Sequence, residues 1–188
     1  MKTRDISYAA MFTAAMVVVS IFSRFVPLPV GGVPFSLQPL VVYLVGGLLN
    51  KRTAVLSMSA YVLLGLIGIP VFTSAPFGGI GYVMSPTFGF LIGFILAAWL
   101  MAMTLERTGR TVPGYLLACG VGLLVIYLVG LPYLYMILNF YLGKAVSIAG
   151  VMKIGLIPFI GLDLIKAGVA AIVCYAVRAR IYPLGDAA

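Results

Sequence analysis

Residues 88–105 read FGFLIGFILAAWLMAMTL, a run of eighteen residues without one charged side chain. About 20 apolar residues are the length that crosses the hydrocarbon core of a bilayer as an α-helix. The rest of the chain has the same character, since 63% of its 188 residues are hydrophobic, 9% are charged and the mean hydropathy is +1.20. The sequence therefore predicts an integral membrane protein that forms a single domain over residues 1–188.

Five further apolar segments accompany this run, and together they predict an all-α bundle of six transmembrane helices. The connections after helices 1, 3 and 5 are expected to be structured, and the one after helix 3 is rich in glycine and proline with almost no charge. Because non-helical backbone at membrane depth must be buried in protein or line a cavity, we expect it to fold back into the bundle. The predicted helices cover residues 6–26, 40–49, 54–69, 88–105, 115–138 and 152–177.

Basic side chains predict the orientation of this bundle. With both termini in the cytoplasm, the inner side has eight Lys and Arg residues and the outer side has three, Arg24, Lys144 and Lys153. This excess follows the positive-inside rule, so the three structured connections are predicted to face outward. The first apolar run is too long for a signal peptide and is predicted to remain as a helix. The inner eight are Lys2, Arg4, Lys51, Arg52, Arg107, Arg110, Arg178 and Arg180.

The residue types present restrict the chemistry. The chain has no histidine and four acidic residues, which leaves no basis for a metal site, and no other cofactor is expected. It has no nucleophile beside a plausible base, so we do not expect an enzyme. It also lacks an ATP-binding phosphate loop, and its scattered basic residues do not form a nucleic-acid surface.

Asp163 and Lys166 lie inside the last apolar segment, in the stretch GLDLIKAG (residues 161–168). A central Asp or Lys costs roughly 2.5 to 3.5 kcal/mol to insert into a membrane, so such residues face a cavity or each other. Three positions apart on a helix, the two side chains share one face. They are interpreted either as a structural ion pair or as a clamp for a ligand, and the neighbouring connections favour the clamp.

Those connections supply uncharged polar groups and flexible backbone. The polar groups are those of Ser36, Gln38, Thr73, Ser74, Ser85 and Thr87, and apolar walls are offered by Phe77, Tyr82, Phe88 and Phe90. Gly78, Gly79 and Gly81 permit close approach of the backbone to a bound molecule. Glycine-rich loops also occur for purely conformational reasons. Together with the buried pair, these residues predict an outward-facing pocket for a small molecule with an amide-like head, an apolar body and an acid.

Three motifs resemble the BioY family, the biotin-binding S components of energy-coupling factor (ECF) transporters. They are VPFSLQPLVVYLVGGLL (residues 33–49), LLGLIGIPVFTSAPFGGIGYVMSPTFGFLIGF (residues 63–94) and DLIKA (residues 163–167). The resemblance implies a biotin pocket facing outward in a prokaryotic plasma membrane. It also implies delivery of biotin to the cytoplasm together with a membrane-coupling T subunit and two ATPase subunits, an ABC-type importer.

The resemblance also implies roles for individual residues. The family's acid and lysine fall on Asp163 and Lys166, its loop elements on Gln38, Gly78 and Gly79, and Tyr43 of the first motif is added to the predicted site. Its docking motif for the partner subunits falls on Ala10 and Ala14, whose small side chains four positions apart let another helix approach closely.

The chain departs from the family pattern in two places. It reads SPTFGF (residues 85–90) where the family commonly reads GPTGGY, and SAPF (residues 74–77) contains no Asn or Arg where relatives often have a polar contact. Part of the recognition is therefore assigned to Ser85, Tyr82 or backbone amides. The alternative function is a proton-coupled carrier for a small carboxylate, in which Asp163 titrates beside Lys166.

Overall fold

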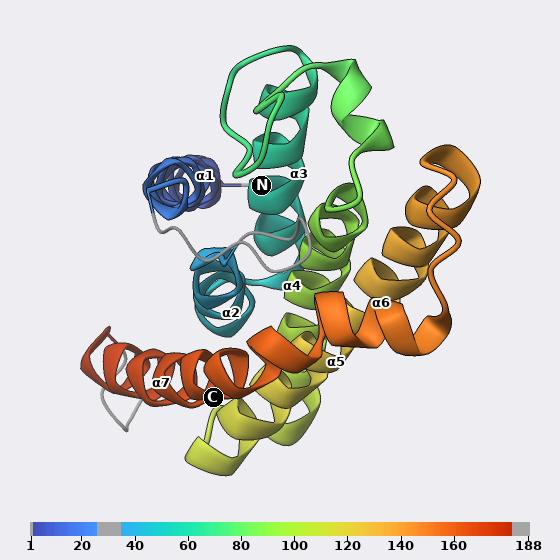
Figure 1. Cartoon of the computed structure of the whole chain (residues 1–188). Helices are drawn as coiled ribbons and strands as arrows, with labels where there is room; N and C mark the ends of the chain where they lie inside the picture. The colour runs from blue at the N-terminus through green and yellow to red at the C-terminus, as the bar shows by residue number, and fades with distance from the viewer. Residues whose placement is uncertain (1, 26–34, 182–188) are drawn as a thin grey trace.

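The computed structural model describes residues 2–25 and 35–181, and within these parts of the chain every regular element is helical (Figure 1). The predicted all-α architecture is therefore confirmed. The elements are α1 (Thr3–Ser23), α2 (Gln38–Leu48), α3 (Lys51–Leu66), the short 3₁₀ helix η1 (Ile80–Met84), α4 (Phe88–Thr108), α5 (Val112–Met136), the π-helical turn η2 (Ile137–Tyr141), α6 (Ile148–Gly155) and α7 (Ile157–Ile181).

Four of the described helices are long and apolar enough to cross a membrane, namely α1, α4, α5 together with η2, and α7. The two remaining helices that were predicted to span are shorter, since α2 has 11 residues and α3 has 16. Both run through the buried core beside the long helices (Figure 1). Length and composition alone thus identify four spans.

Polar side chains before the helices determine where several of them begin. Asn50 caps α3, because its side chain accepts a hydrogen bond from the Thr53 amide at 3.0 Å. Thr111 caps α5 and Ser147 caps α6 in the same way. Side chains of this kind satisfy amides in the first turn that have no partner within the helix.

The predicted sixth helix, residues 152–177, is two helices rather than one. α6 ends at Gly155, and α7 begins at Ile157 after a break at Leu156. Pro158 explains the break, since a proline ring has no N–H to donate and clashes with the preceding helical turn, whereas it is accepted in the first turn of a new helix. The break turns Gly155 and Phe159 toward the cavity described below.

The α3–α4 loop (residues 67–87) folds back onto α3. Its Val71, Phe72 and Thr73 are buried, and the Gly79 amide donates to the Gly65 carbonyl at 2.7 Å. A Cβ atom on Gly65 would lie 2.0 Å from the Phe72 ring, so only glycine allows this ring to pack there. The loop is therefore a packed part of the fold.

Helix α1 lies at the edge of the bundle and contacts α3 and α2 (Figure 1). Its C-terminal end is attached to the α3–α4 loop by Arg24, whose guanidinium donates to the carbonyls of Phe72, at 3.1 Å, and Pro70. The Arg24 guanidinium also lies over the Phe77 ring, 4.5 Å from its centroid. This attachment fixes the loop over the core beside the cavity.

Candidate functional site

A cavity lies where the α3–α4 loop meets the junction of α6 and α7. With the space at its open side counted, its empty volume is about 610 Å³. Its lining residues come from α2, η1, α4, α5, α6 and α7, from the segment before α2 and from the α3–α4 loop. They are Ser36, Gln38, Pro39, Thr73, Ser74, Tyr82, Thr87, Phe90, Leu91, Phe94, Ile126, Tyr127, Gly155, Phe159, Asp163 and Lys166.

One end of the cavity contains the buried ion pair of α7. The Lys166 ammonium donates to Oδ1 of Asp163 at 2.7 Å, and the two residues are 9% and 6% exposed. The Tyr127 hydroxyl of α5 donates to Oδ2 of the same carboxylate at 2.6 Å. Both carboxylate oxygens thus have a donor, and the pair is neutral overall, which is what makes its burial tolerable.

Lys166 has a second partner in the chain segment before α2. Its ammonium donates to the Ser36 carbonyl at 2.7 Å and lies 4.4 Å from the centroid of the Phe35 ring. An ammonium has three N–H groups, and these contacts to Asp163 and Ser36 use two of them. One donor is left for a ligand.

Gln38 lies beside this pair and connects the segment before α2 to the α3–α4 loop. Its Oε1 accepts from the hydroxyls of Thr73, at 2.8 Å, and Ser36, at 2.9 Å, while its Nε2 donates to the Tyr61 hydroxyl at 2.7 Å. Tyr61 donates further to Ser20 of α1 at 3.1 Å. The side wall of the cavity is therefore a connected set of hydrogen bonds, which holds its polar groups in fixed positions.

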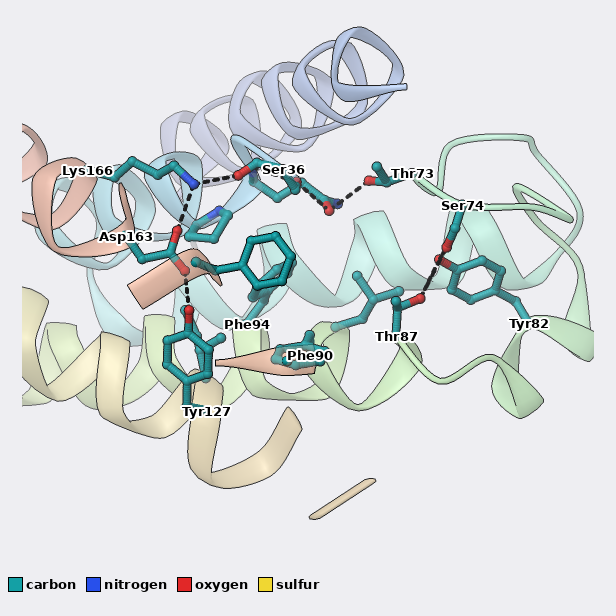
Figure 2. A pocket seen from close by; sticks show the side chains of 16 residues that line it. Ser36, Thr73, Ser74, Tyr82, Thr87, Phe90, Phe94, Tyr127, Asp163 and Lys166 are labelled. Carbon is teal, nitrogen blue, oxygen red and sulfur yellow. Dashed lines mark hydrogen bonds and ion pairs between the residues drawn. The ribbon is translucent and has the colours of Figure 1, made fainter. Parts of the chain in front are cut away.

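The opposite end of the cavity is made of hydroxyl groups. Figure 2 shows Ser74, Tyr82 and Thr87 together at one side of the view and Asp163, Lys166 and Tyr127 at the other. The Ser74 and Tyr82 hydroxyls are 2.7 Å apart, and that of Thr87 lies 3.2 Å from the first and 3.0 Å from the second. Ser74 comes from the α3–α4 loop, Tyr82 from η1, and Thr87 directly precedes α4.

Apolar side chains line the space between the two polar ends. Phe90 and Phe94 of α4 are seen there in Figure 2, and Ile126 of α5 and Phe159 of α7 complete the wall. The cavity is thus apolar in its middle and polar at both ends. Such an arrangement orients a ligand whose polar groups are separated by a hydrocarbon body.

Of the eight residues predicted to bind the substrate, four line the cavity, namely Asp163, Lys166, Gln38 and Tyr82. Ser85 is half-buried next to it and shares a hydrogen bond with Thr87 at 3.0 Å, but it is not a lining residue. Ser85 is therefore connected to the cavity through the hydroxyl of Thr87.

Gly78, Gly79 and Tyr43 lie away from the cavity wall. A Cβ atom on Gly78 would lie 2.5 Å from the Ile69 carbonyl oxygen, and Gly79 has a φ of 93°, so both glycines are needed for the folding of the α3–α4 loop. Tyr43 is fully buried in α2, and its hydroxyl has no hydrogen-bond partner among the described residues.

Tyr127 is the principal site residue that the sequence did not predict. It lies 36 positions from Asp163, in an apolar helix, and no local pattern connects the two. Phe94, Ile126 and Phe159 were missed for the same reason, since each resembles the other apolar residues of its helix. The sequence had also indicated four uncharged polar residues of the connections, Ser36, Thr73, Ser74 and Thr87, and all four line the cavity.

The two small residues predicted to dock a partner, Ala10 and Ala14, are both exposed. They line an open groove between α1 and α3 whose other walls are apolar, including Val17, Leu56 and Leu63. Among the described residues, the groove and the cavity share no lining residue, and α1 contributes only to the groove. A binding site and a docking surface are thus compatible on this fold.

Among the described residues there is no group of three or more His, Cys, Asp or Glu side chains that could hold a metal ion. The cavity walls contain hydroxyls, one amide, one carboxylate and one ammonium. These groups can recognise a ligand by hydrogen bonds and charge, and the α-helical, largely apolar fold places them within a membrane protein. The fold and the site thus define a membrane protein with a cavity for a small molecule.

The sequence profile of the BioY family matches residues 1–182, and the chain belongs to this family. BioY proteins are transporter S components, and the family is not one of enzymes. The chain is 40% identical over 172 residues to the probable biotin transporter BioY of Lysinibacillus sphaericus, covering 91% of this chain and 85% of the relative. It is 36% identical to the biotin transporter BioY of Thermotoga maritima, covering 90% and 93%.

A solved structure has the same fold. It is the crystal structure of the S component for biotin from an ECF-type ABC transporter, and the two chains superpose with a TM-score of 0.69 at 24% sequence identity. The match covers 95% of this chain and 94% of the other. The arrangement of helices described above is therefore that of an ECF S component.

Proposed function

We propose that this chain binds biotin in the cavity beside Asp163 and Lys166 and acts as the biotin-specific S component of an ECF-type importer. One observation carries the proposal. In a member of the BioY family, this acid and this lysine are the only charged residues among the described residues that line the cavity, and they are bonded to each other at 2.7 Å.

The chemistry of the pair favours the ureido ring of biotin over its carboxylate. A ureido group donates two N–H groups and accepts through one carbonyl, and Asp163 offers acceptor lone pairs beside the one free donor of Lys166. A carboxylate at the same place would meet the Asp163 carboxylate, and like charges repel strongly in a buried site. The ureido ring therefore binds at the Asp163–Lys166 end.

Transport requires partner subunits in this proposal. The chain captures biotin on the outer side of the membrane, and a T subunit with two ATPases drives its delivery to the cytoplasm. Ala10 and Ala14 serve as the docking surface, because their small exposed side chains line an open apolar groove. Capture from outside follows from the excess of basic residues at the opposite end of the helices.

The membrane topology that supports this function has six crossings, with α2 and α3 as short spans beside the four long ones. Both helices pack on long spans. Helix α2 packs on α4 and α7, and helix α3 packs on α4 and α1, so both lie within the same layer as the long helices. Residues 1–188 then act as one domain with both termini in the cytoplasm. Protease protection of tags at the two termini in intact cells tests this topology.

Binding by purified protein tests the function directly. We expect Asp163→Asn and Lys166→Ala each to weaken biotin binding at least about tenfold, or 1.4 kcal/mol, because each leaves the other buried charge without its partner. Lys153→Ala is the matched control, since Lys153 is exposed on α6 and outside the cavity wall. Unchanged affinity in both cavity variants by isothermal calorimetry contradicts the proposed site.

Reconstitution separates this function from the proton-coupled alternative. Biotin uptake into liposomes by the chain alone, driven by a proton gradient and lost in Asp163→Asn, would support a carrier. Uptake that needs ATP and the partner subunits supports the S component.

A further inference from the structure

Among the residues that the structure describes, the hydroxyl end of the cavity is built from uncharged groups. Ser74, Tyr82 and Thr87 line the cavity there, and each of their three hydroxyls lies within 3.2 Å of the other two. Ser85 adds a fourth hydroxyl, 3.0 Å from that of Thr87. We refer to Ser74, Tyr82 and Thr87 as the hydroxyl cluster.

Arg24, a cation that contacts the α3–α4 loop, has partners outside the cavity. Arg24 donates to the Pro70 and Phe72 carbonyls and lies over the Phe77 ring, and it is not a lining residue of the cavity. The charged lining residues, Asp163 and Lys166, lie at the other end (Figure 2). A ligand group at the hydroxyl cluster therefore meets no formal charge from the described residues of the cavity wall.

Hydroxyl groups differ from a cation in that each can donate or accept a hydrogen bond. A carboxylate at the hydroxyl cluster would receive O–H donors from it, since hydroxyl hydrogens rotate to suit their partner. A neutral amide at the same place would both receive such donors and give its own N–H groups to the hydroxyl oxygens. An arginine or lysine in this position would offer donors alone and would favour the anion strongly.

The geometry assigns the hydroxyl cluster as the subsite for the tail of the ligand, and we propose that it accepts a carboxylate or a neutral carboxamide there with similar affinity. This rests on the proposed function, in which the ureido ring occupies the Asp163–Lys166 end. The apolar walls between the two ends, with Phe90 and Phe94, then hold the hydrocarbon part of the ligand. The ligand class is thus biotin together with derivatives whose acid group has become an amide.

Three ligands test the assignment on the purified full-length protein: biotin, biotin amide and 2-iminobiotin. Biotin amide changes only the tail, and we expect its dissociation constant to lie within about tenfold of that of biotin. The imino compound instead changes the ring, since it is cationic near neutral pH and lacks the carbonyl acceptor. We expect it to bind at least about 100-fold more weakly, because it would bring a second cation against Lys166.

Two variants of the hydroxyl cluster sharpen the test. Thr87→Val and Tyr82→Phe keep the shape of the side chain and remove one hydroxyl each. A hydrogen bond to an ionised acceptor is about twice as strong as a neutral one, so we expect about a tenfold loss for biotin and about a threefold loss for biotin amide. Thr104→Val is the matched control, because its hydroxyl bonds the Leu100 carbonyl within α4, outside the cavity, and we expect less than a twofold change.

The outcomes distinguish a failure of the proposed function from a failure of the hydroxyl-cluster assignment. Undetectable binding of biotin by the wild-type protein overturns the proposed function, and with it this inference. If biotin binds, a loss of more than 100-fold on changing the acid to the amide overturns the inference alone. Equal losses of affinity for biotin and its amide in both variants also overturn the inference. So does a loss in Lys166→Ala that affects biotin but not its amide, because the carboxylate would then lie at the Asp163–Lys166 end. Each comparison uses one protein sample with two ligands. If a variant is only partly folded, the measured stoichiometry falls, but the ratio of the two dissociation constants does not change.

Discussion

The hydrogen bond from Tyr127 to Asp163 offers a way to separate the stability of the site from its affinity. Tyr127→Phe removes the hydroxyl that donates to Oδ2 of Asp163 at 2.6 Å and leaves the ring in place. The ring packs edge-on against Phe90, with centroids 6.3 Å apart, and phenylalanine keeps that contact. The change is therefore confined to one donor.

The size of the effect follows from the environment of the carboxylate. A hydrogen bond to a charged group contributes about 1.5 to 3 kcal/mol to stability, and Asp163 is only 6% exposed, so water replaces the lost donor poorly. We expect the bond to persist when a ligand binds, so that it affects affinity only by holding the carboxylate in the orientation that the ligand needs. We expect the free energy of unfolding to fall by about 1.5 to 3 kcal/mol, and affinity to fall by about three- to tenfold.

Thermal unfolding in detergent and calorimetry with biotin measure the two quantities on the same preparation. Tyr175→Phe is the control, because Tyr175 is 40% exposed on α7 and lies outside the cavity wall. A Tyr127→Phe protein with a lower melting temperature and unchanged affinity would refute a positioning role. A loss of affinity beyond 100-fold would refute it as well, since that would require direct contact between the hydroxyl and the ligand.

Three further changes test other parts of the structure. Ala14→Trp fills the groove beside α1, so we expect biotin uptake by cells containing the partner subunits to be lost while calorimetric affinity stays within about twofold; loss of binding would contradict this. Gly65→Val brings a side chain against the Phe72 ring, so we expect a lower melting temperature and at least tenfold weaker binding as the α3–α4 loop moves; wild-type values for both would contradict the packing. Glu106→Gln removes the exposed ion pair with Lys51, whose side chains are 42% and 44% exposed, and we expect less than about 1 kcal/mol of change, so a large drop in melting temperature would be against this reasoning.

Much of the fold could be predicted from the sequence because the membrane imposes simple rules. Long uncharged runs such as residues 88–105 must be helical, since no other open structure satisfies its backbone in lipid. The boundaries were less predictable. A continuous helix over residues 152–177 was expected, but Pro158 ends α6 and starts α7, because a proline that breaks one helix is equally suited to begin the next.

In the candidate site, too, some residues could be predicted from the sequence and others could not. Asp163 and Lys166 were identifiable because charges inside an apolar segment are rare and costly, and their spacing of three places them on one helix face. Gly78 and Gly79 were identifiable as unusual, but their purpose was not. A glycine pattern reports that a side chain is excluded, and only the structure shows that the excluding neighbour of Gly78 is the Ile69 carbonyl.

By itself, the sequence determined that this protein is a helical membrane protein with an ion pair on its last helix, since these properties depend on composition and on residues within one helical turn. The tertiary structure alone decided that Tyr127 would hold Asp163 and that the Ser36 carbonyl would hold Lys166, across 36 and 130 positions of chain. It also decided that the hydroxyls of Ser74, Tyr82 and Thr87 would meet at the far end of one cavity. Such pairings depend on how helices pack against each other, and helix packing is determined by the shapes of many side chains together rather than by any local pattern.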